Sequence, residues 1–301
     1  MTATASELPA GTLPNFFILG AGRCGTTSLV RALRAHPEIF VPEIKEPSFF
    51  ASSWQWVKNP VTYAELYREA GSARAIGDAS HLYLEDPQSA PTLKAFFPEA
   101  KFVLVFRHPT DRALALYSMM LEGGYEWLPT FEAALRAEER RYSSSRFRRR
   151  CPHSFWNFMY FRSGLFAEQI ERYRRHFPSE RFLYTTLRRL VESTDEELAR
   201  VHRFLGVGPR SVREFPRDGT SKGVASIPLA WIERRVLRPL SRRTGGILEP
   251  ARQRLVRFNR ERGSKPTMRD ETRRRLDADY ERDLERLVEL AGIDLRQPAD
   301  V

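Results

Sequence analysis

Cysteine is scarce in this 301-residue sequence, and long hydrophobic runs are missing. Two cysteines, Cys24 and Cys151, are too few for a disulfide framework or a thiolate metal site, which suits a reducing compartment. No stretch approaches the roughly 20 apolar residues of a membrane-spanning helix, and residues 1–14 lack a basic region followed by an apolar run. We therefore expect a cytoplasmic protein without an export signal or a membrane anchor, and a disordered tail over residues 1–14.

Lysine is also rare, since only six of the 49 basic residues are lysines and the rest are arginines. Against 38 acidic residues they leave a net charge of +11, which predicts an anionic partner. Arginine favours fork-like recognition of oxyanions, but composition alone leaves nucleic acid, membrane lipid, an acidic polymer and a phosphorylated cofactor open. The arginine runs over 146–150 and 234–243 are interpreted as solvated faces.

The hydrophobic pattern predicts an α/β fold, because short apolar runs alternate with segments of helical spacing as in a parallel sheet flanked by helices. The expected strands cover 15–20, 38–41, 74–77, 101–107 and 181–185, and the expected helices include 27–35, 111–121, 130–141 and 164–176. Thr194 and Glu197 form a capping-box pattern before a further helix. We predict a P-loop-NTPase-like single domain over 15–296, with an Arg-, Gly- and Pro-rich flap over 210–266 and a C-terminal helix over 267–291.

A glycine-rich segment links the first expected strand to the first expected helix. Residues 20–27, GAGRCGTT, have the glycine spacing of the phosphate-binding pattern GxxxxGK[ST], but Thr26 stands at the lysine position. Backbone amides of such a loop and the N-terminus of the next helix form a positive concavity that holds an anionic group. Arg23 can supply the missing positive charge, while Thr26, Thr27 and Ser28 offer hydroxyl donors. The alternative is a glycine turn that only lets the helix pack closely.

The end of the most apolar strand argues against a nucleoside-triphosphate enzyme. A kinase or hydrolase needs a magnesium-holding acid at the end of a second apolar strand. The expected strand over 101–107 ends instead in Arg107. Arginines near two strand ends, without a carboxylate for a metal, predict a donor that carries several phosphates and transfers its group without magnesium.

Seven short motifs follow one another in order between about residues 15 and 290. They are FILGAGRCGTTS at 17–28, KEPSFF at 45–50, GDASHLY at 77–83, FRHPTDR at 106–112, SGLFAEQ at 163–169, HRFLG at 202–206 and SKG at 221–223. In this order they resemble the sulfotransferases that use 3′-phosphoadenosine 5′-phosphosulfate (PAPS), in particular the bacterial and heparan-sulfate-type carbohydrate branch.

The resemblance implies a donor site that needs no metal ion. The loop residues that would hold the 5′-phosphate and the sulfate are Arg23, Cys24, Gly25, Thr26, Thr27 and Ser28. Arg107 would bind the 3′-phosphate. Lys222 and Gly223 match a late loop that closes over the 3′-phosphate and the adenosine, although an exposed turn fits them equally well.

Three positions depart from the family pattern, and one of them is Ser48, where the heparan-type branch tends to place a histidine. A serine that usually contacts the 3′-phosphate is replaced by Ala115, eight residues after Arg107, with Ser118 one helical turn later. A lysine that is common in the heparan-type branch is replaced by Ala79, so the cation that helps the leaving group must come from Arg23 or elsewhere.

Two residues compete for the role of general base, which must take the proton of the acceptor hydroxyl. Glu46 matches the catalytic glutamate of the heparan-type enzymes, whereas His81 falls where cytosolic small-molecule sulfotransferases carry their catalytic histidine. We favour Glu46 because its surrounding motif matches better, and we assign Arg23 to stabilise the leaving group. Without such roles, Glu46 would be a surface charge paired with Lys45, and His81 a polar loop residue.

The sequence thus predicts an enzyme that moves a sulfuryl group from PAPS to a hydroxyl, or to an amine, of a glycan, lipid or small molecule. A P-loop kinase-like phosphotransferase and a non-catalytic basic module for acidic polymers stay as alternatives. Nucleic acid is not expected as a partner, and peripheral membrane contact is left open.

Overall fold

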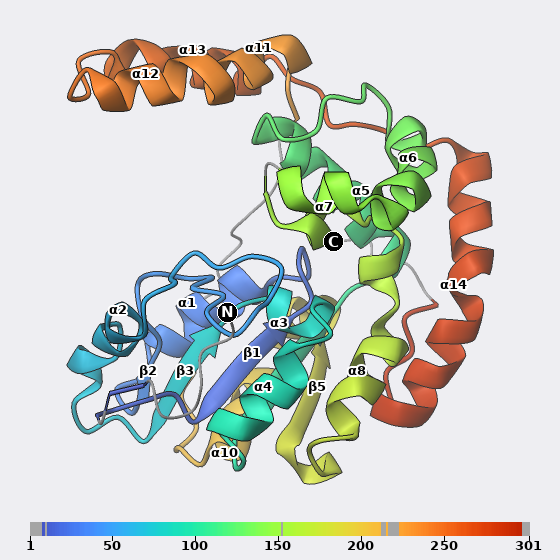
Figure 1. Ribbon diagram of the computed structural model, residues 1–301. Coiled ribbons are helices and arrows are strands. Elements are labelled where there is room, and N and C mark those ends of the chain that lie inside the picture. The colour runs from blue at the N-terminus through green and yellow to red at the C-terminus, as the bar shows by residue number, and fades with distance from the viewer. Residues whose placement is uncertain (1–7, 10, 152, 212–214, 216–222, 297–301) are drawn as a thin grey trace. The chain divides into compact units, whose positions relative to one another are not determined.

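The chain folds into two compact units. The computed structural model describes residues 8–296 except 10, 152, 212–214 and 216–222 (Figure 1). The first unit comprises 1–109, 165–219 and 280–301, and the second comprises 110–164 and 220–279. Most of the expected N-terminal tail, and Lys222, lie outside the described residues.

The first unit contains a five-stranded parallel sheet with the strand order β2-β3-β1-β4-β5. Its strands are β1 (Phe16–Gly20), β2 (Ile39–Phe40), β3 (Ala75–Ala79), β4 (Lys101–Phe106) and β5 (Phe182–Thr186). The central strands β1 and β4 are buried almost throughout, as their continuous apolar runs require when both faces of a sheet are covered. The predicted α/β fold, with a P-loop-like parallel sheet flanked by helices, is confirmed.

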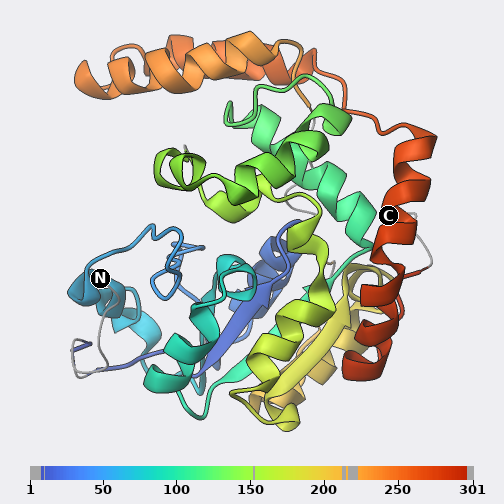
Figure 2. The same ribbon diagram turned by 45° about the vertical axis from the view of Figure 1, so that its right-hand side comes forward.

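Helices cover both faces of this sheet (Figures 1 and 2). One face carries α4 (Ser89–Phe96) and α8 (Phe166–Arg174), and the other carries α1 (Thr26–Arg34) and α10 (Thr194–Leu205). The shorter helices of this unit are α2 (Pro60–Glu65), η2 (Arg68–Ala70), α3 (Leu82–Glu85), η5 (Ser179–Arg181) and α9 (Leu187–Glu192). Because the strand order reverses beside β1, the loop after β1 lies at the switch point where α/β sheets bind ligands.

The expected capping box at Thr194 and Glu197 is wrong. Ser193 precedes α10 without a side-chain cap among the described residues, and the Thr194 hydroxyl donates to the Leu190 carbonyl at 2.8 Å. Glu197 is buried and accepts a hydrogen bond from Thr185 of β5 at 2.8 Å. This glutamate therefore anchors α10 to the sheet instead of capping the helix.

The second unit is mostly helical. Its helices are α5 (Pro109–Glu122), α6 (Phe131–Ser143), α7 (Ser145–Arg150), η3 (Phe155–Phe158), η4 (Arg162–Gly164) and the first part of α14 (Asp270–Ala291), besides those of 227–261. A buried cluster holds the early segments together. Arg141 donates to both oxygens of Glu126 at 2.6 and 2.9 Å, and Tyr160 donates to the same carboxylate at 2.8 Å.

Residues 227–262 form a helical hairpin within the segment 210–266, for which the sequence predicted an Arg-, Gly- and Pro-rich flap. α11 (Ile227–Ile232), the π-helical turn η6 (Glu233–Leu237) and α12 (Arg238–Arg243) run as one rod, and α13 (Glu249–Glu261) returns beside it (Figures 1 and 2). Two of the prolines that suggested a flap, Pro228 and Pro250, lie in the first turns of α11 and α13, where the missing N–H is not needed. In the part of the chain that the structure describes, no helix has the length and apolar character to cross a membrane.

Candidate active site

The loop between β1 and α1 is shaped to receive an anion. Gly20 and Gly25 have φ angles of 135° and 89°, which glycine adopts readily, and Gly25 directly precedes α1. Among the described residues no side chain caps the first turn of α1, and this turn contains no acidic residue, so its N–H groups and the helix dipole favour an oxyanion. The loop is closely packed, because a Cβ on Gly22 would lie 2.9 Å from the His81 ring and one on Gly25 would lie 2.6 Å from Leu187.

The side chains of the predicted loop residues differ in exposure. Arg23 is half-buried, Thr26 and Ser28 are buried, and Thr27 is exposed. Cys24 is buried and its Sγ lies 3.8 Å from a carbonyl of the same loop, so its side chain packs within the loop. The loop therefore offers backbone N–H groups, hydroxyls and one guanidinium to an anion.

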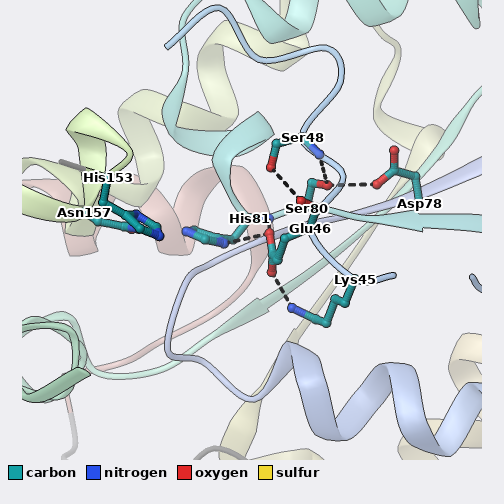
Figure 3. Close-up of polar contacts among 8 residues, drawn as sticks. All are labelled: Lys45, Glu46, Ser48, Asp78, Ser80, His81, His153 and Asn157. Atoms are coloured by element: carbon teal, nitrogen blue, oxygen red, sulfur yellow. Dashed lines mark hydrogen bonds and ion pairs between the residues drawn. The ribbon is translucent and has the colours of Figure 1, made fainter. Parts of the chain in front are cut away.

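Glu46 and His81, which the sequence presented as rivals, are hydrogen-bonded to each other (Figure 3). Glu46 lies in the loop after β2 and His81 directly after β3, and these neighbouring parallel strands bring their carboxyl ends together. Glu46 Oε2 accepts from the backbone N–H and from Nδ1 of His81, each at 2.8 Å. Lys45 forms an ion pair with Oε1, and the Glu46 N–H donates to the Ala79 carbonyl at 3.0 Å. The two candidate bases thus form one hydrogen-bonded pair.

The charges of this pair stabilise each other. Burial by itself would raise the pKa of Glu46, but the positive charges of His81 and Lys45 and their hydrogen bonds hold that pKa well below its usual range. Burial would likewise lower the pKa of His81, but the Glu46 carboxylate raises it to about 9. At neutral pH Glu46 is therefore a carboxylate and His81 an imidazolium.

A second carboxylate, Asp78 in β3, supports the loop after β2. Its Oδ2 accepts from the hydroxyls of Tyr63 and Tyr83 at 2.8 Å each, and its Oδ1 accepts from Ser80 at 2.9 Å. The Ser80 hydroxyl in turn accepts the Ser48 N–H at 3.0 Å (Figure 3). Burial raises the pKa of Asp78 to about 6, although its hydrogen bonds oppose this shift. Asp78 is therefore a buried positioning group.

Unusual backbone conformations occur in the loops around the Glu46–His81 pair. Among the described residues, only three non-glycine residues have a positive φ: Arg23 at 69°, Glu46 at 63° and Ser48 at 51°. The left-handed conformation costs an L-residue about 1–2 kcal/mol, so it persists only where surrounding contacts hold it. All three residues lie in the loops around the Glu46–His81 pair, and strain of this kind concentrates at functional sites.

Arg107 lines a pocket beside the carboxyl ends of β4 and β5. The pocket has a volume of about 280 Å³, and its polar lining includes Arg107, His108, Thr186, Arg188 and Asp294. The Nε atom of Arg107 is buried and has no hydrogen-bond partner among the described residues. Since buried donors are nearly always paired, this guanidinium is prepared to bind an oxyanion.

The late loop predicted to close over the donor belongs to the second unit. Lys222 lies outside the described residues, and the Gly223 N–H donates to Glu122 at 2.7 Å. Gly223 has a φ of 83°, and a Cβ there would lie 2.0 Å from the Ser264 carbonyl oxygen. The local backbone therefore requires glycine at this position, whatever its role toward a donor.

Ala79 and Ala115 replace a lysine and a serine of the family pattern, and within the described residues no metal-binding cluster occurs. Ala79 is buried at the end of β3 and supplies no cation. Ala115 lies in α5, where the nearby Ser118 hydroxyl is buried without a hydrogen-bond partner among the described residues. The same part of the chain contains no group of three or more His, Cys, Asp or Glu side chains that could hold a metal ion.

Sequence reasoning missed the buried network behind the pair. Asp78 and Ser80 stand in the same motif as His81, and the available signal is a carboxylate within an otherwise apolar strand. A charged group in such a strand needs hydrogen-bond partners, so it predicts a buried network. Tyr63 and Tyr83 carry no comparable signal, because large aromatic residues are more often core packing.

The chain matches a known family over most of its length. The family described as Sulfotransferase domain covers residues 13–217, and the chain belongs to this family. The predicted membership of the PAPS-dependent sulfotransferase family is confirmed. This family membership argues against the kinase-like alternative.

Named relatives agree with this family, and one solved structure shares the fold. Human heparan sulfate glucosamine 3-O-sulfotransferase 3A1 is 27% identical over 219 residues, which are 68% of this chain and 50% of that protein. The human 3-O-sulfotransferase 6 is 26% identical over 194 residues, 64% of this chain and 52% of that protein. The chain spans about half the length of these curated relatives. The crystal structure of a sulfotransferase from Alicyclobacillus acidocaldarius has a TM-score of 0.70 at 24% identity, covers 95% of this chain and 98% of that one, and shares the fold.

Proposed function

We propose that the protein transfers the sulfuryl group of PAPS to a hydroxyl of a glycan acceptor. The family supports PAPS as the donor, and relatives named as heparan sulfate glucosamine 3-O-sulfotransferases support a sugar hydroxyl as the acceptor. The observation that carries the proposal is the hydrogen-bonded Glu46–His81 pair, which lies against the anion-binding loop after β1.

The donor would occupy the two anion-receiving places of the first unit. Its phosphosulfate end would lie in the loop after β1, where Arg23, the hydroxyls and the first turn of α1 supply hydrogen-bond donors. Its 3′-phosphate would lie in the pocket beside Arg107, because the buried Nε there needs an acceptor. A bisphosphorylated nucleotide meets both requirements.

The acceptor oxygen would attack the sulfur while the bond from sulfur to the bridging phosphate oxygen breaks. The electron pair of that bond leaves with adenosine 3′,5′-bisphosphate, and the hydroxyl proton goes to Glu46. A carboxylate has about four acceptor positions. Hydrogen bonds from Lys45 and His81 occupy three of those of Glu46, which leaves one on Oε1. The side chain of Glu46 is 30% exposed, so an acceptor can reach it.

His81 would supply the positive charge that Ala79 does not. Its ring lies against Gly22 of the anion-binding loop, and Glu46 keeps it protonated at neutral pH. A fixed cation at this place stabilises the charge that develops on the leaving phosphate, together with Arg23. Glu46 would therefore act both as the general base and as the counter-ion of His81.

Calorimetric titration with adenosine 3′,5′-bisphosphate tests the donor assignment. We expect tight binding without magnesium, weakened about 10–100-fold by Arg107→Ala because a charge-assisted hydrogen bond is lost. The matched control is Arg68→Ala, which removes an exposed arginine of η2 in the same unit and leaves binding unchanged. A preference for ATP with magnesium would contradict the assignment.

A product assay tests the acceptor. The protein is incubated with PAPS and, separately, with a desulfated heparan-type glycan, a glycolipid and a simple phenol, and the products are identified by mass spectrometry. We expect sulfated glycan together with an equal amount of adenosine 3′,5′-bisphosphate. Sulfation of the phenol alone would reject the glycan and leave the donor assignment in place.

A further inference from the structure

The helical hairpin over 227–262, which we call the basic hairpin, concentrates the positive charge of the chain. It contains ten arginines, three glutamates and neither lysine nor aspartate, so it holds seven of the +11 net charges. Eight of these arginines are exposed: Arg235, Arg238, Arg242, Arg243, Arg254, Arg257, Arg260 and Arg262. The transfer chemistry proposed for the first unit uses none of them.

Two of the three glutamates are neutralised inside the hairpin. Arg252 of α13 forms ion pairs with Glu233 of η6 and with Glu249 in the first turn of α13. The Arg252 Nε also donates to Glu249 at 2.9 Å. Glu261 is the one glutamate of the hairpin that remains to face solvent together with the exposed arginines. The outward charge of the hairpin is therefore almost entirely positive.

The basic hairpin also exposes large hydrophobic side chains. Ten such side chains are exposed in the described part of the chain, and six belong to the hairpin: Trp231, Ile232, Val236, Leu240, Ile247 and Phe258. Ile232, Val236 and Leu240 recur at intervals of four residues, so they follow one face of the rod formed by α11, η6 and α12. Ile247, in the turn before α13, is 82% exposed.

We propose that the basic hairpin docks on an anionic lipid bilayer. Arg235, Arg238 and Arg242 recur at intervals of three and four residues and form a second stripe beside the apolar one. A helix with this arrangement lies in the plane of the membrane surface, with its apolar side chains among the acyl chains and its arginines at the lipid phosphates. The arginine stripe therefore matches the lipid headgroups, and the apolar stripe matches the acyl chains beneath them.

Other occupants match the two stripes less well. An acidic glycan or a nucleic acid would pair with the arginines but leave Ile232, Val236 and Leu240 in water. A second copy of the chain would bring the same excess of positive charge to the same surface, and like charges repel. A bilayer with anionic lipids satisfies both the charge and the exposed apolar area.

Vesicle co-sedimentation with the full chain tests the proposal. We expect binding to vesicles of phosphatidylglycerol and phosphatidylcholine in equal amounts, and little binding to phosphatidylcholine alone. The triple variant Arg235→Gln, Arg238→Gln, Arg242→Gln should lose affinity on the order of 100-fold. The triple variant Ile232→Gln, Val236→Gln, Leu240→Gln should lose affinity on the order of 10-fold with its charge intact. Glutamine is a good helix former, and circular dichroism checks that both variants stay folded.

Matched controls separate this surface from general charge or hydrophobicity. Arg274→Gln, Arg275→Gln, Arg282→Gln removes three exposed arginines of α14, and Val61→Gln with Trp127→Gln removes two exposed apolar side chains. Neither control should change vesicle binding. No binding to anionic vesicles overturns the proposal, as does an apolar variant that binds like the wild type, which would indicate a site for acidic polymers. Concentration-dependent dimers that both hairpin variants abolish, without vesicle binding, would assign the surface to a second copy.

Discussion

The site of the first unit and the basic hairpin of the second unit use charge in opposite ways. At the site each charge is held in place: Glu46 is hydrogen-bonded to His81 and paired with Lys45, and the Nε of Arg107 is buried beside its pocket. In the hairpin eight arginines face water, and the ion pair of Arg252 with Glu233 holds the two helical arms together. Few oriented charges suit directional chemistry, whereas many exposed charges give a salt-sensitive attraction to a surface.

Removing the charge of Glu46 tests the role of the fixed charges at the site and has the largest expected effect. Glu46→Gln should lower kcat by about 10²–10⁴-fold, because glutamine cannot accept the hydroxyl proton. Glu43→Gln is the matched control, since its carboxyl is 93% exposed and lies three residues earlier. Steady-state kinetics measures both variants. A nearly normal kcat in Glu46→Gln would show that Glu46 is not the general base.

The pH profile sharpens the division of roles within the pair. If His81 acts as the cation, kcat should fall as pH rises through about 9, where the imidazolium loses its proton. The limiting slope is about tenfold per pH unit, because one proton is lost. Turnover measured across this range decides the matter. A rise of kcat through the same range would make His81 the base and Glu46 its orienting partner.

Breaking the internal ion pairs tests how the hairpin is held together. Arg252→Met should speed amide hydrogen exchange in α13 about two- to fivefold, because hydrogen bonds to two charged partners at a solvent-screened surface are lost. Amide hydrogen exchange in α13 measures this change. Arg254→Met is the control, since Arg254 is exposed on the same helix. Equal exchange rates in both variants would contradict the role of Arg252.

The smallest expected effect is on the stability of the first unit. The pKa of His81 is raised from 6.5 to about 9 in the folded protein, so its ion pair stabilises fully below pH 6.5 and is lost as pH rises through 9. The difference in Tm between wild type and His81→Gln should therefore shrink between these limits. A difference that stays constant with pH would mean that His81 stabilises only by packing.

The sequence predicted the first unit better than the second for a physical reason. Continuous apolar runs such as 102–106 can only be buried strands or helices, and the glycine spacing of 20–25 identifies the loop after β1. The hairpin lacks such a signal, because its arginine-rich arms look solvated and its prolines look like helix breakers. Pro228 and Pro250 instead lie in the first turns of α11 and α13.

The pairing of Glu46 with His81 was hidden for another reason. Each residue matches a different branch of the family, so the sequence presents them as alternatives. Their contact depends on β2 and β3 being neighbours in the sheet, and strand order is not visible in a motif. Arg23 lies in the loop after β1 and Arg107 directly after β4, both beyond the carboxyl ends of their strands.

The two ends of the basic hairpin are joined by hydrogen bonds. Val224 pairs with Ser264 in an isolated antiparallel bridge, and both sides of the Asn259 amide bond to Ser226. Residues 33 and 40 positions apart in the chain are thereby brought together, so the segment between them could be replaced as a whole and its ends joined by a short turn. Under the two proposals above, exchanging this segment would change the surface that the protein binds and leave the Glu46–His81 pair of the first unit unchanged.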